Sequence, residues 1–415
     1  MGSEYKITPT IHKLLDQLTP MHQSVCIRAA EPFMLRVAEQ YKKIRNNWRE
    51  EINTALFSEE LPKHQHHKLE VLLEALNGMR FSEMPTNIND HNDFEIFVQG
   101  KSNLCGRNID VFAQFTPGKD KHRDNHELML TIDMLVRSGV ERINVFTPYS
   151  LYQREDKKDE GAVPIGAAVW FKMIEERCKG RLNRLITYDL HAGQAQAFID
   201  RPVDHLSAVP YFTRYIYSEY FMKKFGEHLG IVFYSPDPGG IKRVRNIALM
   251  LQSPYGDVDK YRKGHGDSCA GEATNLDCHG KIVVILDDIV DTATTLCEAG
   301  DKLYKCGASR IIAMAPHGVL SDKKHPSRPT KALDKLYDAG IHLVMTDSIP
   351  REYEFYKHPA IEDVLSLAAP TAEIQLLRRL NFSVSSTLAS LIQDIKSHVA
   401  AGKRYENIEQ YLLKI

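Results

Sequence analysis

The densest group of reactive side chains stands directly after the apolar run Ile282–Leu286. Asp287 and Asp288 follow that run, and the start of an expected helix then carries Asp291 and three threonine hydroxyls, those of Thr292, Thr294 and Thr295. In open α/β sheets, ligands bind outside the carboxyl ends of the strands, and the first N–H groups of a helix suit a phosphate. Carboxylates suit sugar hydroxyls, so the segment predicts a sugar-phosphate site. The plainer alternative is an acidic strand end with a helix N-cap, but two consecutive Asp residues after an apolar run weigh against it.

Two further features would serve a phosphorylated ligand. Gly239–Gly240 follows the apolar run Ile231–Tyr234 and allows the backbone to approach a phosphate closely, although a simple strand-to-helix turn would use glycine too. Lys260 and Arg262 stand in a long hydrophilic stretch, Asp257–His279, that is rich in glycine. Such a stretch is expected to be mobile, so its cations could close over a bound ligand.

Several segments together resemble one enzyme family. The loop Asp287–Thr295 is similar to the ribose-5-phosphate loop shared by phosphoribosyl diphosphate (PRPP) synthetases and type I phosphoribosyltransferases. Four other segments resemble elements of PRPP synthetases and occur in the same order as in that family. Tyr152–Asp159 resembles their ATP-contacting stretch, and Thr187–Gln196 resembles their Asp-Leu-His segment. Ser235–Arg243 resembles their Ser-Pro-Asp-x-Gly-Gly segment, and Asp259–Arg262 resembles the start of their mobile catalytic loop. The chain is therefore identified as a member of the PRPP synthetase family.

The resemblance implies an activity and a fold. The activity is transfer of the β,γ-diphosphoryl group of ATP to the 1-hydroxyl of ribose 5-phosphate, which gives PRPP and AMP for nucleotide biosynthesis. The implied cofactor is Mg²⁺, and the implied assembly is a homo-oligomer, a dimer or a hexamer. The implied fold has two tandem, duplicated type I phosphoribosyltransferase-like domains, each a mainly parallel sheet with helices on both faces.

The resemblance also assigns roles to individual residues. Catalysis falls to Lys260 and Arg262, and the metal would be held by His191 and Asp237. The residues assigned to ATP are Phe81, Arg154, Glu155, Asp156, Lys158 and His191. The residues assigned to ribose 5-phosphate are Asp237, Asp287, Asp288, Asp291, Thr292, Ala293, Thr294 and Thr295.

Three departures from the family pattern bear on these roles. At Phe81, only the Phe and the following Ser persist of the segment that packs adenine from a neighbouring subunit. In the loop after Lys158, Glu160 and Ala162 stand where the family carries basic residues, which predicts weak or absent activation by phosphate. Thr294 replaces a glycine of the phosphate loop, and a β-branched residue requires an ordinary φ at that position.

Three other functions stay open on the sequence alone. A non-catalytic regulatory subunit of the same family is disfavoured because the metal and loop residues are all present. A phosphoribosyltransferase shares the phosphate loop, but a duplicated chain with the stretch Asp156–Lys158 disfavours it. A diphosphokinase for a larger ribosyl phosphate is compatible with the altered loops.

Strands and helices in alternation must position these residues. Continuous apolar strands that alternate with helices indicate a parallel sheet covered on both faces, which is the α/β class. The expected strands are Ile143–Thr147, Leu185–Leu190, Ile231–Tyr234, Ile282–Leu286, Ile311–Met314 and Ile341–Met345. The expected helices between them include Ile165–Cys178, Ile241–Leu251 and Thr292–Cys306.

An internal match indicates duplication. The segments Leu135–Pro148 and Leu303–Pro316 share Leu, Gly, Arg, Ile and Pro at one constant offset without a gap. Each copy has the pattern of a helix, a glycine after its end and a buried strand. The expected organisation is an N-terminal extension, an ATP-side domain, a ribose-5-phosphate-side domain and a helical tail, at residues 1–23, 24–206, 207–370 and 371–415.

The expected additions at both ends are helical. The leucines of Leu69–Leu76 recur at helical spacing, whereas His64–His67, just after Pro62, is expected to be a solvated loop rather than a metal site. The tail carries an apolar stripe through Val384–Val399 that could pack on its own domain or on a partner helix.

Composition excludes several classes of protein. The chain has 415 residues, with 53 Lys and Arg against 54 Asp and Glu, which argues against a broad nucleic-acid or membrane surface. No apolar run is long enough to span a bilayer, and the N-terminus lacks the apolar core of a signal peptide. Seven scattered cysteines in a chain of this size favour a reducing compartment, so a cytoplasmic protein is expected.

Overall fold

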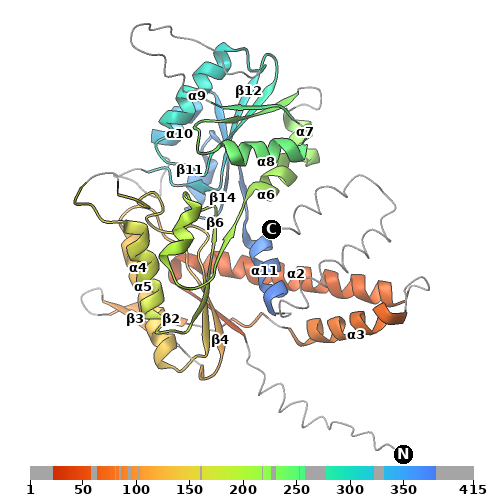
Figure 1. The fold of residues 1–415 in the computed structure, drawn as a ribbon, viewed down its shortest axis with the longest axis vertical. Coiled ribbons are helices and arrows are strands. Elements are labelled where there is room, and N and C mark those ends of the chain that lie inside the picture. The colour runs from red at the N-terminus through yellow and green to blue at the C-terminus, as the bar shows by residue number, and fades with distance from the viewer. Residues whose placement is uncertain are drawn as a thin grey trace, which may run out of the picture.

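The computed structural model describes residues 22–379, apart from residues 58–62, 80, 84–85, 92–94, 101–102, 159–160, 217, 226–229, 252, 258–276 and 322–330. Two parallel sheets with helices around them form the two ends of the molecule (Figure 1). This arrangement confirms the α/β class. The helical stripe expected at Val384–Val399 lies outside the described residues.

The N-terminal sheet has the strand order β1-β4-β5-β6-β7, and every neighbouring pair is parallel. Its central strands are largely buried because helices cover both faces, and Ile109, Val111, Ile143 and Val145 lie in the core. The strands are β1 (Gln23–Cys26), β4 (Asn108–Phe112), β5 (Arg142–Phe146), β6 (Leu182–Tyr188) and β7 (Val203–Leu206). The helices of this half include α2 (Glu31–Leu56), α4 (Asp120–Arg137) and α5 (Gly166–Arg177), with 3-10 turns η1 (Arg28–Ala30) and η3 (Gly193–Phe198).

The C-terminal sheet has the order β15-β14-β12-β10-β8-β9 and is also parallel throughout. Its strands are β8 (Ile231–Ser235), β9 (Tyr255–Asp257), β10 (Ile282–Leu286), β12 (Arg310–Ala315), β14 (Ile341–Thr346) and β15 (Ile361–Leu365). Its helices include α7 (Glu219–Phe225), α8 (Ile241–Leu251), α9 (Thr294–Lys305) and α10 (Lys331–Asp338), with the 3-10 turn η4 (Tyr353–Lys357). The predicted strands and helices therefore occur within a few residues of their expected bounds.

The two sheets confirm the predicted duplication. In both sheets, strands that follow one another in the sequence lie next to one another in the sheet, apart from the additional edge strand β9. Gly139 and Gly307 end equivalent helices with φ of 75° and 86°, a conformation that favours glycine. The carbonyl oxygen of Gly139 accepts the N–H of Gly106, and that of Gly307 accepts the N–H of Gly280.

The helix that follows each sheet packs on the other domain. Helix α6 (Val209–Ile216) comes directly after β7, yet its apolar residues belong to the core beneath β8 and β10. Helix α11 (Ala368–Arg379) comes directly after β15, yet Ala372 and Leu376 belong to the N-terminal core, and α11 lies beside α2 (Figure 1). The start of the tail is thus helical and completes the N-terminal domain.

Two elements depart from the expectations. The stretch His64–His67 forms the beginning of helix α3 (Lys63–Gly78), so the prediction of a solvated loop is wrong. The leucines that follow explain why His64–His67 is helical. The buried Leu69, Leu72 and Leu76 anchor helix α3, and His64–His67 extends that helix toward its N-terminus. The antiparallel hairpin of β2 (Thr86–Asp90) and β3 (Ile96–Gly100) was not predicted, nor was the short parallel pair of β11 (Ile289–Val290) and β13 (His317–Gly318).

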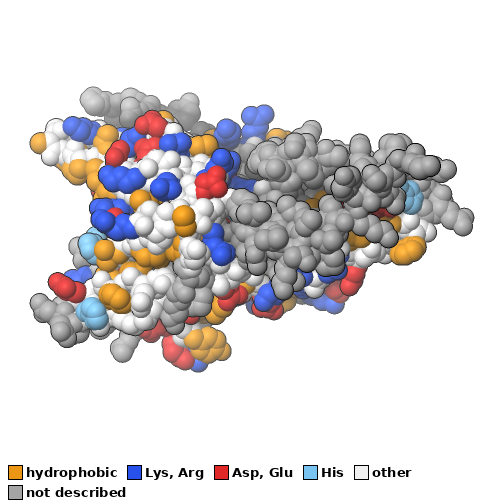
Figure 2. Space-filling model, turned by 90° about the horizontal axis from the view of Figure 1, so that it is seen from below, with side chains coloured by type: hydrophobic (Ala, Val, Ile, Leu, Met, Phe, Trp, Pro, Cys, Tyr) orange, Lys and Arg blue, Asp and Glu red, His pale blue; other side chains and the backbone are white. Residues whose placement is uncertain are grey.

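The surface agrees with the balanced charge. On the face shown in Figure 2, basic and acidic side chains lie side by side and do not separate into one broad basic area. None of the helices in the described ranges is long and apolar enough to cross a membrane.

A buried polar network fastens α11 to the N-terminal sheet. Asp110 on β4 accepts hydrogen bonds from Asn144 at 2.7 Å, from Gln375 at 3.1 Å and from Arg379 at 3.0 Å. The side chains of Arg379 and Asp110 are only 5% and 4% exposed. Removing one member of such a buried pair leaves the other charge without its partner, which is costly.

We expect Arg379→Met to lower the free energy of unfolding of the N-terminal domain by about 3 kcal/mol, because Asp110 would stay buried without its cation. Urea denaturation followed by tryptophan fluorescence measures this loss. Arg137→Met is the matched control, since Arg137 pairs with Asp133 on the surface and is 78% exposed. Equal effects of the two substitutions would contradict the structural role assigned to Arg379.

Candidate functional site

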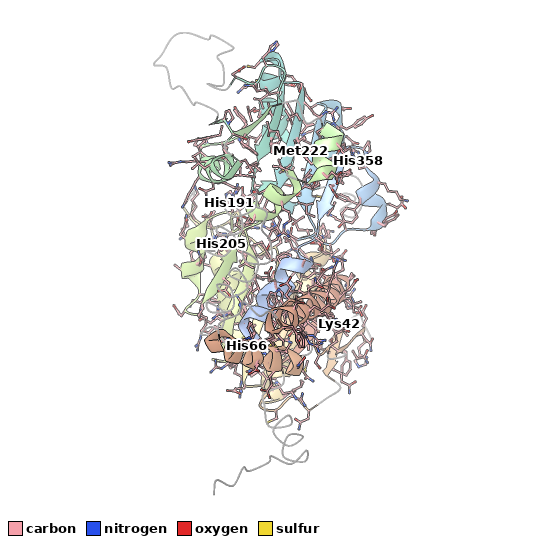
Figure 3. All side chains as sticks on the ribbon, turned by 90° about the vertical axis from the view of Figure 1, so that its right-hand side faces the viewer. Lys42, His66, His191, His205, Met222 and His358 are labelled. Atoms are coloured by element: carbon pink, nitrogen blue, oxygen red, sulfur yellow. The ribbon has the colours of Figure 1, made fainter. Side chains whose placement is uncertain are left out.

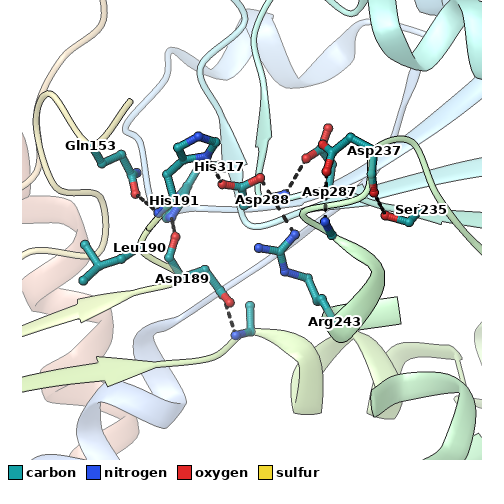
Figure 4. Close-up of polar contacts among 12 residues, drawn as sticks. Gln153, Asp189, Leu190, His191, Ser235, Asp237, Arg243, Asp287, Asp288 and His317 are labelled. Atoms are coloured by element: carbon teal, nitrogen blue, oxygen red, sulfur yellow. Dashed lines mark hydrogen bonds and ion pairs between the residues drawn. The ribbon is translucent and has the colours of Figure 1, made fainter. Parts of the chain in front are cut away.

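The predicted functional residues gather where the carboxyl ends of the two sheets face each other. His191 follows β6 of the N-terminal sheet, while Asp237 follows β8 and Asp287–Asp288 follows β10 of the C-terminal sheet. Figure 4 shows His191, Asp288, Asp287 and Asp237 in succession across this junction. The rule that ligands bind at strand carboxyl ends therefore applies to both halves at one place.

A hydrogen bond joins the two halves at the centre of the site. The Nδ1 of His191 lies 2.6 Å from Oδ2 of Asp288, and the backbone N–H of His191 donates to Oε1 of Gln153 at 3.0 Å. The hydrogen bond to Asp288 raises the pKa of His191 above its ordinary value, although partial burial opposes the rise. His191 is thus held with Nδ1–H toward the carboxylate and with Nε2 available to a ligand.

The pKa values of the two consecutive aspartates are shifted in opposite directions. Burial, reinforced by the neighbouring Asp288, raises the pKa of Asp287 to about 7. Burial also acts to raise the pKa of Asp288, but the His191 hydrogen bond and the nearby Arg243 guanidinium outweigh it and hold that pKa well below its usual range. The site therefore keeps one firmly ionised carboxylate beside a second that titrates near neutral pH.

The phosphate loop has the features of an anion site. Helix α9 begins at Thr294, just after Ala293, whose φ of 59° lies in the left-handed region. Thr294 itself has an ordinary φ, as its β-branched side chain requires. The Nζ of Lys335 on α10 lies 3.3 Å from both the Thr292 carbonyl oxygen and Thr294 Oγ1, so a cation stands beside the first turn of the helix. Sequence analysis missed Lys335, because no local pattern connects α10 with this loop.

The turn after β8 is built around Asp237. Its Oδ1 accepts the N–H of Gly240 at 2.9 Å, and the hydroxyl of Ser235 donates to its carbonyl oxygen at 2.6 Å. A Cβ on Gly240 would lie 2.6 Å from Ser235 Oγ, closer than such atoms approach in proteins. Glycine is thus required for the turn itself, which is the plainer of the two roles expected for this residue.

The predicted ATP stretch reaches across to the phosphate loop. The guanidinium of Arg154 pairs with Asp291 of the C-terminal half at 2.9 Å. Glu155, Asp156 and Lys158 follow on an accessible loop after β5. A residue assigned to ATP and a residue assigned to ribose 5-phosphate are therefore in direct contact.

His317 is a buried residue at the junction that sequence analysis did not identify. Its Nε2 lies 3.1 Å from the carbonyl oxygen of Tyr188 at the end of β6, and its Nδ1 lies 3.0 Å from Ser348 Oγ. A carbonyl can only accept, so Nε2 carries the proton, and burial lowers the pKa of His317 so that the ring stays neutral. A histidine two residues beyond the strand Arg310–Ala315 was the available signal.

Among the described residues of the predicted set, Phe81 lies away from this junction. Lys260 and Arg262 lie outside the described residues. Phe81 is 9% exposed and packs edge-on against Tyr41 at 5.5 Å between ring centroids, on the side of α2 and α3. Its assigned contact with the adenine of a neighbouring subunit stays a prediction.

A cleft of about 270 Å³ adjoins the site between the corner of β6 and β7, helix α6 and the start of α8. Its polar walls include Asp189, His205, Lys242, Arg243 and Asn246. Figure 3 places His191 and His205 at the middle of the molecule, where the two halves meet. The cleft thus extends the same junction with a basic wall.

The donor set fits a magnesium ion that is shared with phosphates. Within the ranges that the structure describes, no three His, Cys, Asp or Glu side chains converge closely enough to hold a metal alone. Mg²⁺ is commonly bound through one or two protein ligands together with substrate phosphates and water. A histidine whose Nδ1–H is fixed by a carboxylate, as His191 is by Asp288, has the orientation found in metal-binding histidines.

Comparisons with known proteins agree on one family. The family model for the N-terminal domain of ribose phosphate pyrophosphokinase matches residues 50–177, and the phosphoribosyl transferase domain matches residues 216–346. A ribose-phosphate pyrophosphokinase from Cereibacter sphaeroides is 35% identical over 318 residues, which cover 76% of this chain and 88% of the relative. The ribose-phosphate pyrophosphokinase from Helicobacter hepaticus is 36% identical over 317 residues, which cover 75% of this chain and 94% of the relative.

A solved structure shares the fold. The crystal structure of phosphoribosylpyrophosphate synthetase from Mycobacterium smegmatis superposes with a TM-score of 0.66 at 24% identity. The match covers 88% of this chain and 99% of that one, so the shared fold extends over both halves.

In metal-free protein, we expect the pKa of His191 to lie above 6.5 and to fall when Asp288 is replaced by Asn, because the carboxylate stabilises the imidazolium. The pair stabilises the fold fully below pH 6.5 and loses this contribution as the pH rises through the raised pKa of His191. At acid pH, the ionised Asp288 carboxylate sets the limit. Its contribution to the stability of the fold is full above pH 3.8 and is lost only as the pH falls through its lowered pKa.

An NMR titration of the imidazole nitrogens measures the predicted shift. The neutral, buried His317 is the internal control, because its pKa should stay below 6.5 in both proteins. A pKa of His191 at or below 6.5 in the unsubstituted protein would contradict the pairing with Asp288.

Proposed function

The chain belongs to the ribose-phosphate pyrophosphokinase family, and on that premise we propose that it makes PRPP. The reaction transfers the β,γ-diphosphoryl group of ATP to the 1-hydroxyl of ribose 5-phosphate. The anomeric oxygen attacks the β-phosphorus and loses its proton, the bond from the β-phosphorus to the α,β-bridging oxygen breaks, and AMP leaves with that oxygen. The observation that carries the proposal is the contact of the two predicted substrate loops through Arg154–Asp291 and His191–Asp288.

Ribose 5-phosphate is assigned to the C-terminal half. Its phosphate would bind the N–H groups at the start of α9 and the hydroxyls beside them, with Lys335 adding positive charge. Its hydroxyls would bind Asp287 and Asp288 at the end of β10. The residues proposed for this substrate are Asp237, Asp287, Asp288, Asp291, Thr292, Ala293, Thr294 and Thr295.

ATP is assigned to the N-terminal half. Arg154 stands opposite the phosphate loop, so an ATP polyphosphate bound there would lie between the two sheets. The residues proposed for ATP are Phe81, Arg154, Glu155, Asp156, Lys158 and His191. Holding both substrates at facing strand ends supplies the orientation on which phosphoryl transfer chiefly depends.

Mg²⁺ is the proposed cofactor, with His191 and Asp237 as its protein ligands. When bound, the ion neutralises charge on the phosphate oxygens. Asp288 would orient His191 through Nδ1, while Gly240 N–H would hold the carboxylate of Asp237. Lys260 and Arg262 are proposed to stabilise the non-bridging oxygens of the transferred group in the transition state.

The assembly and location are also proposals. We infer a cytoplasmic homo-oligomer, a dimer or a hexamer, from the family resemblance, the balanced charge of the sequence and the free cysteines of the described residues. The partners of the reaction are the two small substrates, with no nucleic acid and no membrane.

Incubation with ATP, Mg²⁺ and ribose 5-phosphate should release AMP and PRPP in equal amounts, because each transfer forms one of each. Phosphorus NMR and nucleotide chromatography measure the two products. AMP no higher than in the sample with ATP alone would contradict the activity and favour a non-catalytic subunit. Formation of AMP only with a larger ribosyl phosphate would instead identify a different acceptor.

Lys260→Ala should lower kcat by about 10²–10³-fold, because a cation that acts on transition-state charge is lost. Lys263→Ala is the matched control, since it removes the same charge three residues further along the same stretch. Circular dichroism of both variants shows whether the fold is intact. Near-normal turnover of folded Lys260→Ala would remove this residue from catalysis.

A further inference from the structure

His317, the first residue of β13, contacts the backbone on both sides of the central hydrogen bond. Its side chain is fully buried, and its Nε2 lies 3.1 Å from the carbonyl oxygen of Tyr188 and 3.3 Å from that of Asp189. Its backbone N–H donates to the carbonyl oxygen of Asp288 at 3.1 Å. Figure 4 shows His317 together with His191 and Asp288. A single residue of the C-terminal half therefore connects the chain just before His191 with Asp288.

The orientation of the His317 ring is fixed by the groups around it. Both backbone atoms that face Nε2 are carbonyl oxygens, so Nε2 must donate and Nδ1 must accept in the neutral ring. The donor to Nδ1 is the hydroxyl of Ser348 at 3.0 Å, because the nearby carbonyl oxygen of Pro316 already accepts the hydroxyl of Thr346 at 2.7 Å. The ring also packs edge-on against Tyr149, with 5.1 Å between the ring centroids. The donor at Nε2 is therefore directed at the end of β6.

The backbone after His317 follows the loop between β10 and α9. Strand β13 pairs in parallel with β11, which belongs to that loop. Farther along, the N–H of Leu320 donates to the carbonyl oxygen of Val290 at 2.9 Å, and the N–H of Ser321 donates to Oδ1 of Asp291 at 3.2 Å. Leu320 has a φ of 41°, an unfavourable conformation for leucine that persists only where the surroundings enforce it. His317 thus fixes one end of a segment that supports the phosphate loop.

The two contacts between the substrate loops both depend on this arrangement. His191 lies 2.6 Å from Asp288, and Arg154 lies 2.9 Å from Asp291. In each pair, one partner follows a strand of the N-terminal sheet and the other belongs to the loop that runs beside the chain after His317. Transfer between two bound substrates is sensitive to their alignment, since a displacement of about 1 Å can lower a rate about 10²-fold. A residue that sets the spacing of the two loops would therefore affect the rate without joining the reaction.

We propose that His317 is a positioning residue for the diphosphoryl transfer. Its ring is a spacer that holds the end of β6, and with it His191, in register with the loop Asp288–Asp291. The inference rests on the proposed function, because it is this reaction that requires the two loops to be aligned. Since the ring is fully buried, it acts through the residues around it. The role requires a hydrogen-bond donor at the place of Nε2, which packing alone would not require.

Two amide substitutions separate this role from a general contribution to stability. In His317→Asn, the amide reaches only as far as Nδ1, so it can still bond Ser348 but not the carbonyl oxygens of Tyr188 and Asp189. In His317→Gln, the longer side chain places an amide N–H where Nε2 lies. The variants differ by one methylene group and are both neutral, so each is the matched control of the other. Circular dichroism shows whether each variant is folded.

We expect His317→Asn to lower kcat about 10–100-fold, because partners that orient a binding residue have effects of this size when removed. The KM values for ATP and ribose 5-phosphate should stay unchanged, since the groups that bind them remain in place. His317→Gln should restore the turnover of the unsubstituted chain. A second measurement uses no substrate. The NMR signal of the His191 Nδ1 proton, held by Asp288, should be protected from exchange with water in the unsubstituted chain and in His317→Gln, and lost in His317→Asn.

Three results would overturn the proposal. They are normal turnover of His317→Asn, an equal loss of kcat in both variants, and unfolding of His317→Asn, which would assign the residue to stability alone. If the unsubstituted chain forms no PRPP, the proposed function fails. The exchange of the His191 proton then still decides whether His317 positions His191, because that measurement does not depend on turnover.

Discussion

Two carboxylates at equivalent corners of the sheets determine how the halves of the molecule are joined. Asp189 follows β6 and accepts the N–H of Ala208 at 2.7 Å, and Asp347 follows β14 and accepts the N–H of Leu367 at 2.8 Å. Each of them also accepts the hydroxyl of the intervening serine, Ser207 or Ser366. These bonds fix the chain where it leaves its own sheet. The next helix, α6 or α11, is thereby directed onto the opposite domain.

This exchange of helices explains why the carboxyl ends of both sheets meet. Asp189 has a φ of 34°, a left-handed conformation that aspartate tolerates better than most residues, and His191 stands two residues beyond it. The backbone at this bend is also held by His317, which crosses from the C-terminal half to the carbonyl oxygen of Tyr188. His191 therefore reaches Asp288 because structural groups on both sides define its position. The position of His191 thus depends on hydrogen bonds made by Asp189 and His317.

Local patterns predicted the elements but not the contacts between them. The buried strands could be predicted because an apolar run bounded by polar loops is a local signal, and the phosphate loop because an acidic strand end and a helix start are adjacent in sequence. Lys335 and His317 contribute through contacts with residues far away in the chain, so no spacing indicated them. The helix at His64–His67 was missed for a related reason, since packing of later leucines extends a helix through residues with little preference for it. The packing of α11 on the first domain likewise depends on its partner Asp110, which lies 269 residues earlier.

The balance of charge acquires a structural meaning at this junction. Arg154 of one half pairs with the Asp291 carboxylate of the other, and the His191 ring likewise hydrogen-bonds Asp288 across the junction. If a polyphosphate binds at Arg154 as proposed, it competes with Asp291 for the same guanidinium, so that binding would exchange one ionic partner for another. Such an exchange yields less net affinity than an unpaired arginine would. The contacts across the junction therefore join the Arg154 loop of one half directly to the loop before α9 of the other.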